Sequence, residues 1–254
     1  MRFIATADTD VGISKTTNQD SALIKHASTD TGEVLMAILC DGMGGLAKGE
    51  LASATVIREF SKWFDAELPY ELENPDMQVI GNKWSLMLKE LNVKIHEYSE
   101  RTGTNSMGTT FSGILFVGDM YVIAHVGDSR IYHINSAVTQ LTTDQTFIAR
   151  EIARGTMTPE QAKTDKRRNL LLQCVGASKV VEPQIICGRT EPGSYMLCSD
   201  GFRHEISGEE MYRAFTPANI PNKDIMHNNT RQLIDLVKSR GEKDNITAIL
   251  VKAE

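Results

Sequence analysis

The sequence lacks any apolar run long enough to cross a membrane. No stretch approaches the roughly 20 consecutive apolar residues that a membrane-spanning helix needs. The N-terminus reaches Asp8 after only a few apolar residues, which is too short for the core of a signal peptide. We therefore expect a cytoplasmic protein with no membrane partner.

Paired cysteines and an excess of positive charge are also missing. None of the four cysteines belongs to a C-x-x-C pair, which argues against a structural zinc site. They are better explained as small core side chains in a reducing compartment. The formal net charge is −6, which disfavours binding to nucleic acid or to an anionic membrane. A local acidic cluster is therefore the feature to look for.

The chain of 254 residues is long enough to bury a substantial core. Predicted strands come in clusters and amphipathic helices come in consecutive pairs, which favours antiparallel sheets with helices layered on them over alternating βαβ units. We find no repeat, low-complexity tract or linker, so we predict one α+β domain over residues 1–254. The predicted strands are residues 3–7, 21–26, 34–40, 111–117, 120–126, 130–134, 184–187, 194–198 and 246–251.

Two long helices are predicted between the early strands and the strand at 111–117. The first begins after Gly49 and repeats apolar residues at three- and four-residue spacing as far as Phe64. The second has Asn74 as its expected N-cap, Pro75 at its first position and an end near Gly103. Shorter helices are predicted around residues 147–152, after capping boxes at 158–161 and 207–210, and over residues 222–240.

Residues 143–178 form a polar and weakly periodic segment with a basic cluster. Lys163, Lys166, Arg167 and Arg168 lie close together in it. The simpler interpretation is a solvated helical insertion. The alternative is a mobile flap whose basic residues face an anionic partner.

A carboxylate stands where a predicted buried strand ends. Residues 34–40 are apolar, Asp41 follows at once, and three glycines lie within the next four positions: Gly42, Gly44 and Gly45. Glycine allows main-chain carbonyls to approach a ligand closely. The same arrangement, an aspartate at a strand end or in a glycine turn, recurs at Asp20, Asp128, Asp200 and Asp244.

Five such aspartates could converge on one rim of a sheet. Their mutual repulsion would then be relieved by divalent cations. A ligand set made only of oxygens selects Mg²⁺ or Mn²⁺, and an aspartate that bridges two such ions gives a site that activates water and holds a transferring phosphoryl group. Aspartate is also a common turn residue, so five unrelated turns explain the pattern about equally well.

Six short motifs follow one another along the chain. They are Asn18-Gln19-Asp20, Asp41-Gly42-Met43-Gly44-Gly45, Met107-Gly108-Thr109-Thr110, Gly127-Asp128-Ser129-Arg130, Ser199-Asp200-Gly201 and Lys243-Asp244-Asn245. In this order they resemble the signature series of the metal-dependent type 2C (PPM) protein serine/threonine phosphatases, bacterial branch. The resemblance covers residues 1–251, and six motifs in order are far more specific than any one of them.

The resemblance implies a four-layer α-β-β-α sandwich, in which two packed antiparallel sheets are flanked by helices. It also implies a binuclear Mn²⁺ or Mg²⁺ centre at one end of the sandwich. In that centre Asp41 would bridge both metals, and the carbonyl of Gly42 would complete the shell of one of them.

The other ligands are implied in the same way. Asp200 and Asp244 resemble ligands of the first metal, and Asp20 belongs to the shell of the second. Asp128 resembles the ligand shared with a weaker third metal in bacterial members. Residues 143–178 would be the family's flap.

Four positions depart from the family pattern. Lys15 stands where the family usually has an arginine that grips the substrate phosphate, and lysine offers a point charge instead of a bidentate fork. Gln19 stands where animal members have a second acid, and Met43 where they have a histidine proposed as general acid. Gln145 stands where many members have a histidine. The identity of any acid that protonates the leaving group is therefore open.

The implied reaction is hydrolysis of phosphoserine and phosphothreonine by direct in-line attack of a metal-bound hydroxide. Asp41 would act through the metals, while Lys15 would neutralise charge on the phosphoryl oxygens. The expected partners are phosphorylated proteins, namely a bacterial Ser/Thr kinase and its substrates, and the protein is expected to be a monomer.

Two other functions were weighed. Residues 42–47 also fit the dinucleotide fingerprint G-x-G-x-x-A, but Asp41 would repel a pyrophosphate and no short βαβ unit follows. The second alternative is a catalytically weak or inactive phosphatase-like module that binds phosphoproteins. Among the remaining polar residues, we interpret Arg130 as a structural partner of a carboxylate and His125 as a core or rim residue.

Overall fold

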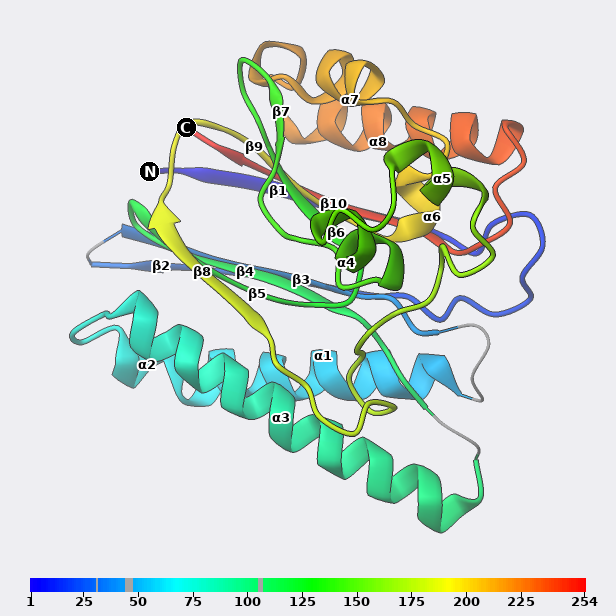
Figure 1. Ribbon diagram of the computed structural model, residues 1–254. Helices are drawn as coiled ribbons and strands as arrows, with labels where there is room; N and C mark the ends of the chain where they lie inside the picture. Colours follow the sequence, from blue (N-terminus) through cyan, green and yellow to red (C-terminus); the bar gives the residue numbers. More distant parts are fainter. Residues whose placement is uncertain (31, 44–47, 105–106) are drawn as a thin grey trace.

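The computed structural model describes residues 1–30, 32–43, 48–104 and 107–254 and arranges them in four layers (Figure 1). Two antiparallel sheets of five strands each pack face to face, and helices cover both outer faces. This α-β-β-α sandwich confirms the predicted fold class.

The strand order explains how segments far apart in the sequence become neighbours. The first sheet has the order β2 (Ser21–Thr29), β3 (Gly32–Cys40), β4 (Phe111–Val117), β5 (Met120–Val126) and β8 (Gln184–Arg189). The second sheet has the order β1 (Phe3–Asp10), β10 (Ile246–Ala253), β9 (Gly193–Cys198), β6 (Arg130–Ile134) and β7 (Val138–Gln140). The predicted hairpin of β2 and β3 is confirmed, with Ser21 paired to Cys40.

Strand β3 is an unbroken apolar run because both of its faces are buried. Successive side chains of a strand point to opposite faces, so alternate residues enter different cores. The residues packed in the core beneath the helices are Val34, Met36, Ile38 and Cys40. The residues packed between the two sheets are Leu35, Ala37 and Leu39.

Long helices cover the outer face of each sheet (Figure 1). The first sheet is covered by α1 (Gly49–Ala66), α2 (Leu68–Glu71) and α3 (Met77–Thr102). The second sheet is covered by α7 (Gly208–Phe215) and α8 (Lys223–Ser239). Between α1, α3 and β4, the ring of Trp84 meets Phe60 edge-on at 5.3 Å and Phe111 at 6.2 Å. Such edge-to-face pairs favour one mutual arrangement of the helices and the sheet.

The start of α3 differs from the prediction. Asp76, and not Asn74, is its N-cap, and the Asp76 carboxylate accepts hydrogen bonds from the amides of Gln78 at 2.8 Å and Val79 at 3.2 Å. The helix begins after Asp76 because its carboxylate accepts hydrogen bonds from two amides of the first turn. This interaction is more favourable than a start with Asn74 as the N-cap and Pro75 as the first helical residue. The predicted end is confirmed, because Gly103 closes the helix with φ of 63°.

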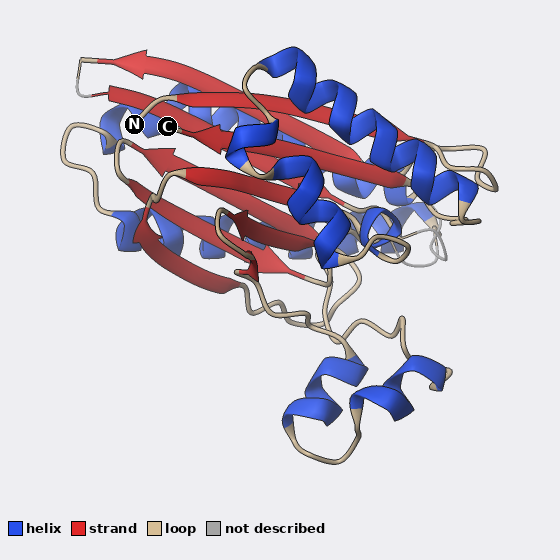
Figure 2. Cartoon of the chain, turned by 90° about the horizontal axis from the view of Figure 1, so that it is seen from above, coloured by secondary structure: helices blue, strands red, loops and turns tan. Residues whose placement is uncertain are grey.

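Residues 143–178 contain two short helices, α4 (Phe147–Ala153) and α5 (Pro159–Thr164). Figure 2 shows this pair projecting from the layered body of the molecule. The predicted capping boxes at Thr158 and at Ser207 are both present. Two further short elements, α6 (Asp200–Arg203) and the 3₁₀ helix η1 (Pro217–Asn219), lie next to the second sheet.

The strand pairing argues against a dinucleotide-binding unit. The strand that follows α1 and α3 is β4, and it pairs antiparallel to β3, whereas a dinucleotide fold needs a parallel crossover. Part of that glycine-rich pattern, residues 44–47, lies outside the described residues. Among the helices in the described part of the chain, none is long and apolar enough to span a membrane.

Candidate metal centre

The five predicted aspartates lie at ends of strands or in the turns between them, at one end of the two sheets. Asp41 follows β3, Asp20 precedes β2, Asp128 lies in the turn between β5 and β6, and Asp200 begins α6 just after β9. Asp244 lies two residues before β10. The carboxylate of Asp41 is influenced by those of all four others, so the fold brings the five together.

The main chain around Asp41 is fixed by the Met107–Thr110 motif. The Asp41 amide donates to the hydroxyl of Thr110 at 3.0 Å, and the Thr110 amide donates back to the Asp41 carbonyl at 2.9 Å. The hydroxyl of Thr109 donates to the same carbonyl at 2.9 Å. The next residue must be glycine, because a Cβ on Gly42 would lie 2.5 Å from the carbonyl oxygen of Gln19. Contacts with a segment 68 and 69 residues away thus hold the main chain of Asp41 in one place.

Asp20 is held from the second sheet. The hydroxyl of Thr247 on β10 donates to Oδ2 of Asp20 at 2.5 Å, and the side chain of Asn18 accepts the Asp20 amide at 3.1 Å. The other carboxylate oxygen, Oδ1, is buried and accepts no hydrogen bond from the described residues. A buried carboxylate oxygen without a donor is costly unless something positive lies beside it.

The Asp244 segment is tied to the loop before β2. The side chain of Asn245 accepts the amide of Gln19 at 2.9 Å and donates to the carbonyls of Val11 at 2.9 Å and Thr17 at 3.2 Å. The same loop carries Lys15, whose ammonium lies 3.1 Å from Oδ1 of Asp244. The candidate phosphate-binding lysine therefore lies at the candidate metal ligands.

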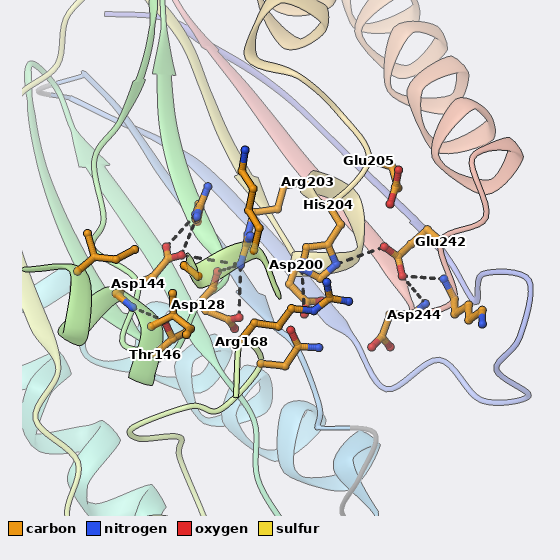
Figure 3. Close-up of a pocket in the computed structure, with 18 of the residues that line it drawn as sticks. Asp128, Asp144, Thr146, Arg168, Asp200, Arg203, His204, Glu205, Glu242 and Asp244 are labelled. Carbon is orange, nitrogen blue, oxygen red and sulfur yellow. Dashed lines mark hydrogen bonds and ion pairs between the residues drawn. The ribbon is translucent and has the colours of Figure 1, made fainter. Parts of the chain in front are cut away.

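Asp128 lies among arginines (Figure 3). Arg203 contacts Asp128 with Nη2 3.3 Å from Oδ2 and 3.2 Å from the main-chain carbonyl. Arg130 forms a two-pronged pair with Asp144, at 2.8 and 2.7 Å, which agrees with the structural role predicted for it. The amide of Gly127 donates to the side chain of Gln145 at 2.9 Å. Gln145, one of the departures from the family pattern, therefore supports the turn that carries Asp128.

Burial, together with the charges of neighbouring carboxylates, raises the pKa values of Asp20, Asp41 and Asp128. Burial raises the pKa of Asp20 to about 7 and that of Asp41 well above its usual range, and the charges of Asp200 and Asp244 add to both shifts. Burial also raises the pKa of Asp128 to about 7, with Asp200 adding to the rise and Arg203 opposing it. Negative charge is therefore concentrated around Asp20 and Asp41 without a nearby cation from the described part of the chain, whereas Arg203 offsets part of the charge at Asp128.

A pocket of about 920 Å³ opens beside the aspartates. Asp128, Asp200 and Asp244 line it from the sheet side, and Figure 3 shows Asp200 and Asp244 near His204 and Glu242. Residues of the 143–178 segment line it as well, among them Lys163, Arg168 and Asn169. An anion in this pocket would meet carboxylates and basic groups together.

Comparison with known proteins decides the family. The family model described as protein phosphatase 2C matches residues 13–235. This chain belongs to the protein phosphatase 2C family. PhpP of Streptococcus pneumoniae is 32% identical over 247 residues, which cover 96% of this chain and 94% of PhpP.

Solved structures of 2C phosphatases agree with this membership. Stp1 from Staphylococcus aureus matches with a TM-score of 0.86 and 31% identity, over 100% of this chain and 96% of Stp1. The catalytic domain of the phosphatase PstP, in complex with 2 manganese ions, matches with a TM-score of 0.76 and 28% identity, over 98% of this chain and 97% of that domain. The family resemblance in the six motifs is therefore confirmed.

The chemistry of the 2C aspartates in this chain fits a hard divalent cation. The donors are all oxygens, one oxygen of Asp20 is buried without a partner, and the raised pKa values mark uncompensated charge. Within the described ranges, no three acidic, histidine or cysteine side chains are already placed to hold a metal ion. Three aspartates instead contact partners from the chain: Thr247 on Asp20, Lys15 on Asp244 and Arg203 on Asp128.

Several residues that shape the site were not assigned from the sequence. Thr110 and Asn245 belong to two of the six motifs, and membership in these motifs was the signal that could have identified them. Arg203, Asp144 and Glu242 lie outside the six motifs and carry no comparable signal. Their partners Asp128, Arg130 and His204 are 75, 14 and 38 residues away in the chain. The predicted glycines 44 and 45 lie outside the described residues.

Proposed function

We propose that this chain is a metal-dependent phosphatase that hydrolyses phosphoserine and phosphothreonine in proteins. The observation that carries the proposal is the convergence of five aspartates from separate segments at one end of the sheets of a 2C family member. The manganese complex of PstP supports a divalent metal in this family. An inactive binding module is less well supported, since all five aspartates are present.

We assign the metal-binding role to Asp20, Asp41, Asp200 and Asp244, together with the carbonyl of Gly42. These oxygens would hold two Mn²⁺ or Mg²⁺ ions. When bound, such ions lower the pKa of water and neutralise charge on a transferring phosphoryl group. That Asp128 serves a third, weaker ion stays a prediction, and the contact of Asp128 with Arg203 favours a guanidinium in that place.

The chain's own contribution is to fix these groups before substrate arrives. Thr109 and Thr110 hold the main chain of Asp41, and Thr247 orients one oxygen of Asp20. Lys15 binds phosphoryl oxygens as a point charge, because its ammonium lies at the edge of the same pocket. Groups held in place in this way cost little reorganisation when charge develops in the transition state.

We further propose that residues 1–254 act as one catalytic domain, with residues 143–178 as a flap over the pocket. Lys163 and Arg168 of that segment line the pocket, which supports a role in binding acidic phosphoprotein segments. The expected substrates are proteins phosphorylated by a Ser/Thr kinase. A cytoplasmic setting and a monomeric state stay predictions from the sequence.

The test is phosphate release from a phosphothreonine peptide with and without Mn²⁺. We expect activity only with the metal, and a loss of about a thousandfold or more in Asp41→Asn. Asp119→Asn, in the turn between β4 and β5, is the matched control, since its carboxylate is exposed and pairs with Arg189. Equal activity of Asp41→Asn and the wild type would contradict the proposal.

A further inference from the structure

Arg203 reaches from α6 to the carboxylate of Asp128. Its Nη2 lies 3.3 Å from Asp128 Oδ2 and 3.2 Å from the Asp128 carbonyl, and the side chains of both residues are only 12% exposed. The same nitrogen lies 3.9 Å from Oδ2 of Asp144. Figure 3 shows Arg203 near both carboxylates. Arg203 thus contacts Asp128 within a pocket that both residues line together with Asp200.

Two further interactions stabilise the contact between Arg203 and Asp128. The hydrogen bond to the main-chain carbonyl of Asp128 holds the guanidinium even if the carboxylate rotates. Asp144 is held in turn by the two-pronged pair with Arg130, whose side chain also donates to the hydroxyl of Tyr132 at 2.9 Å. All three contacts run through Nη2 and hold one edge of the planar guanidinium beside Asp128, while Nε is buried without a hydrogen-bond partner among the described residues.

By formal charge, the acidic side chains of the site fall into two groups. Asp128 and Asp144 carry two negative charges, and Arg203 and Arg130 carry two positive charges beside them. The remaining four aspartates carry four negative charges against the single ammonium of Lys15 beside Asp244, so within the described residues this second group is the one that lacks positive charge. The carboxylates assigned to the metals are Asp20, Asp41, Asp200 and Asp244.

We propose that Arg203 takes the place of a divalent cation at Asp128, so that the chain holds two metal ions and excludes a further one there. The inference rests on the metal centre of the proposed function. A guanidinium that already pairs with Asp128 neutralises this ligand, and it repels a divalent ion strongly in a site partly shielded from water. Arg203 is therefore a determinant of metal stoichiometry in this chain.

Counting bound Mn²⁺ tests the inference without relying on activity. Free Mn²⁺ is measured by electron paramagnetic resonance during titration of the wild type, Arg203→Gln, Arg203→Lys and Asp128→Asn. Glutamine keeps a hydrogen-bond donor and removes the charge, whereas lysine keeps the charge. Circular dichroism checks that each variant is folded.

We expect the wild type and Arg203→Lys to bind the same number of ions. Arg203→Gln gains one more, bound at least about tenfold more tightly than any additional ion in the wild type, because the repelling charge is gone. This additional ion disappears when Asp128→Asn is combined with Arg203→Gln.

Two results overturn the inference while leaving the proposed function intact. One is a further ion in the wild type that Asp128→Asn removes. The other is an unchanged ion count in Arg203→Gln. Failure of the proposed function looks different: the wild type then binds no Mn²⁺ and releases no phosphate, which overturns the inference together with its premise.

Discussion

The ammonium of Lys15 lies 3.1 Å from Oδ1 of Asp244, so the candidate phosphate-binding cation is paired with a candidate metal ligand. Both side chains are partly exposed, with Lys15 at 30% and Asp244 at 43%. A metal bound to Asp244 would weaken this ion pair and leave the ammonium of Lys15 available to a phosphoryl group.

Replacing Lys15 tests this role. We expect Lys15→Ala to lower kcat/KM for a phosphothreonine peptide by roughly 10- to 100-fold, because charge on the phosphoryl oxygens loses a partner. Lys15→Arg should retain or raise activity, since a guanidinium can bind two oxygens at once. Lys243→Ala, at another lysine of the same pocket, is the control. An equal loss in both alanine variants would argue against a specific role for Lys15.

The hydroxyl of Thr110 supports the main chain of Asp41. Thr110→Val keeps the shape of the side chain but leaves the Asp41 amide without its 3.0 Å acceptor. We expect a loss of about 1–3 kcal/mol in the free energy of unfolding, measured by urea denaturation. Thr139→Val, on the exposed face of β7, should change it by less than about 0.5 kcal/mol. If both variants unfold at the same urea concentration, the hydrogen bond matters little.

Gly201 lies against the segment that carries Asp244. A Cβ at position 201 would lie 2.2 Å from the carbonyl oxygen of Asn245, which forces main chain to move. We expect Gly201→Ala to destabilise the protein by roughly 2 kcal/mol or more and to weaken Mn²⁺ binding. Gly208→Ala is the matched control, because a Cβ there meets no atom within 4 Å and alanine favours a helix. Thermal unfolding with and without Mn²⁺ measures both effects, and unimpaired metal binding in Gly201→Ala would refute the coupling.

His125 predicts a dependence of stability on pH. It is fully buried, its Nδ1 lies 2.9 Å from the hydroxyl of Ser112, and its Nε2 donates to the carbonyl of Gly127 at 3.1 Å. Burial lowers the pKa of His125 from 6.5 to about 4. Between these values the unfolded chain binds the additional proton, so stability falls as pH decreases from about 6.5 to about 4.

The difference between the two pKa values corresponds to roughly 3 kcal/mol over the whole interval, of which about 2 kcal/mol falls between pH 7.5 and pH 5. Urea denaturation at pH 7.5 and pH 5 measures it in the wild type and in His125→Gln, which cannot titrate. We expect a smaller loss on acidification in the variant. A loss of the same size in both proteins would mean that other groups cause it.

Arg168 tests the flap proposal. It is exposed, lines the pocket and belongs to the projecting segment. We expect Arg168→Ala to raise KM for an acidic phosphopeptide by about 3- to 10-fold and to leave hydrolysis of p-nitrophenyl phosphate unchanged, since exposed charge pairs are worth about 1 kcal/mol. Lys166→Ala, in the same segment, is the control. Equal effects on both substrates would point to the metal centre instead of the flap.

Much of the fold could be predicted from patterns within single segments. The apolar run of β3, the spacing along α1 and α3, and the capping boxes at Thr158 and Ser207 are local signals, and each element formed as expected. The start of α3 was misplaced because two capping signals competed within three residues, and the stronger acceptor, Asp76, won.

The aspartates of the site could be predicted because motifs place them at strand ends. The side chains that contact these aspartates from distant parts of the chain were much harder to predict. Nothing in the sequence around Arg203 indicates that it contacts Asp128, 75 residues earlier in the chain. Likewise, the sequence does not indicate that the side chain of Gln145 supports the turn of Asp128. Only the folded structure shows that this side chain accepts a hydrogen bond from the amide of Gly127 at 2.9 Å. Pairings of this kind depend on the assembled sheets.

The position of β10 has a consequence for synthesis of the protein. This strand, over Ile246–Ala253, lies between β1 and β9, so the first and last strands described are paired along their length. Thr247 and Asp244, which complete the surroundings of Asp20, are made after the other four candidate aspartates. Contacts between such distant segments form late in folding. A nascent chain that ends before Asp244 therefore lacks both residues, and the proposed metal centre could form only after β10 has been synthesised.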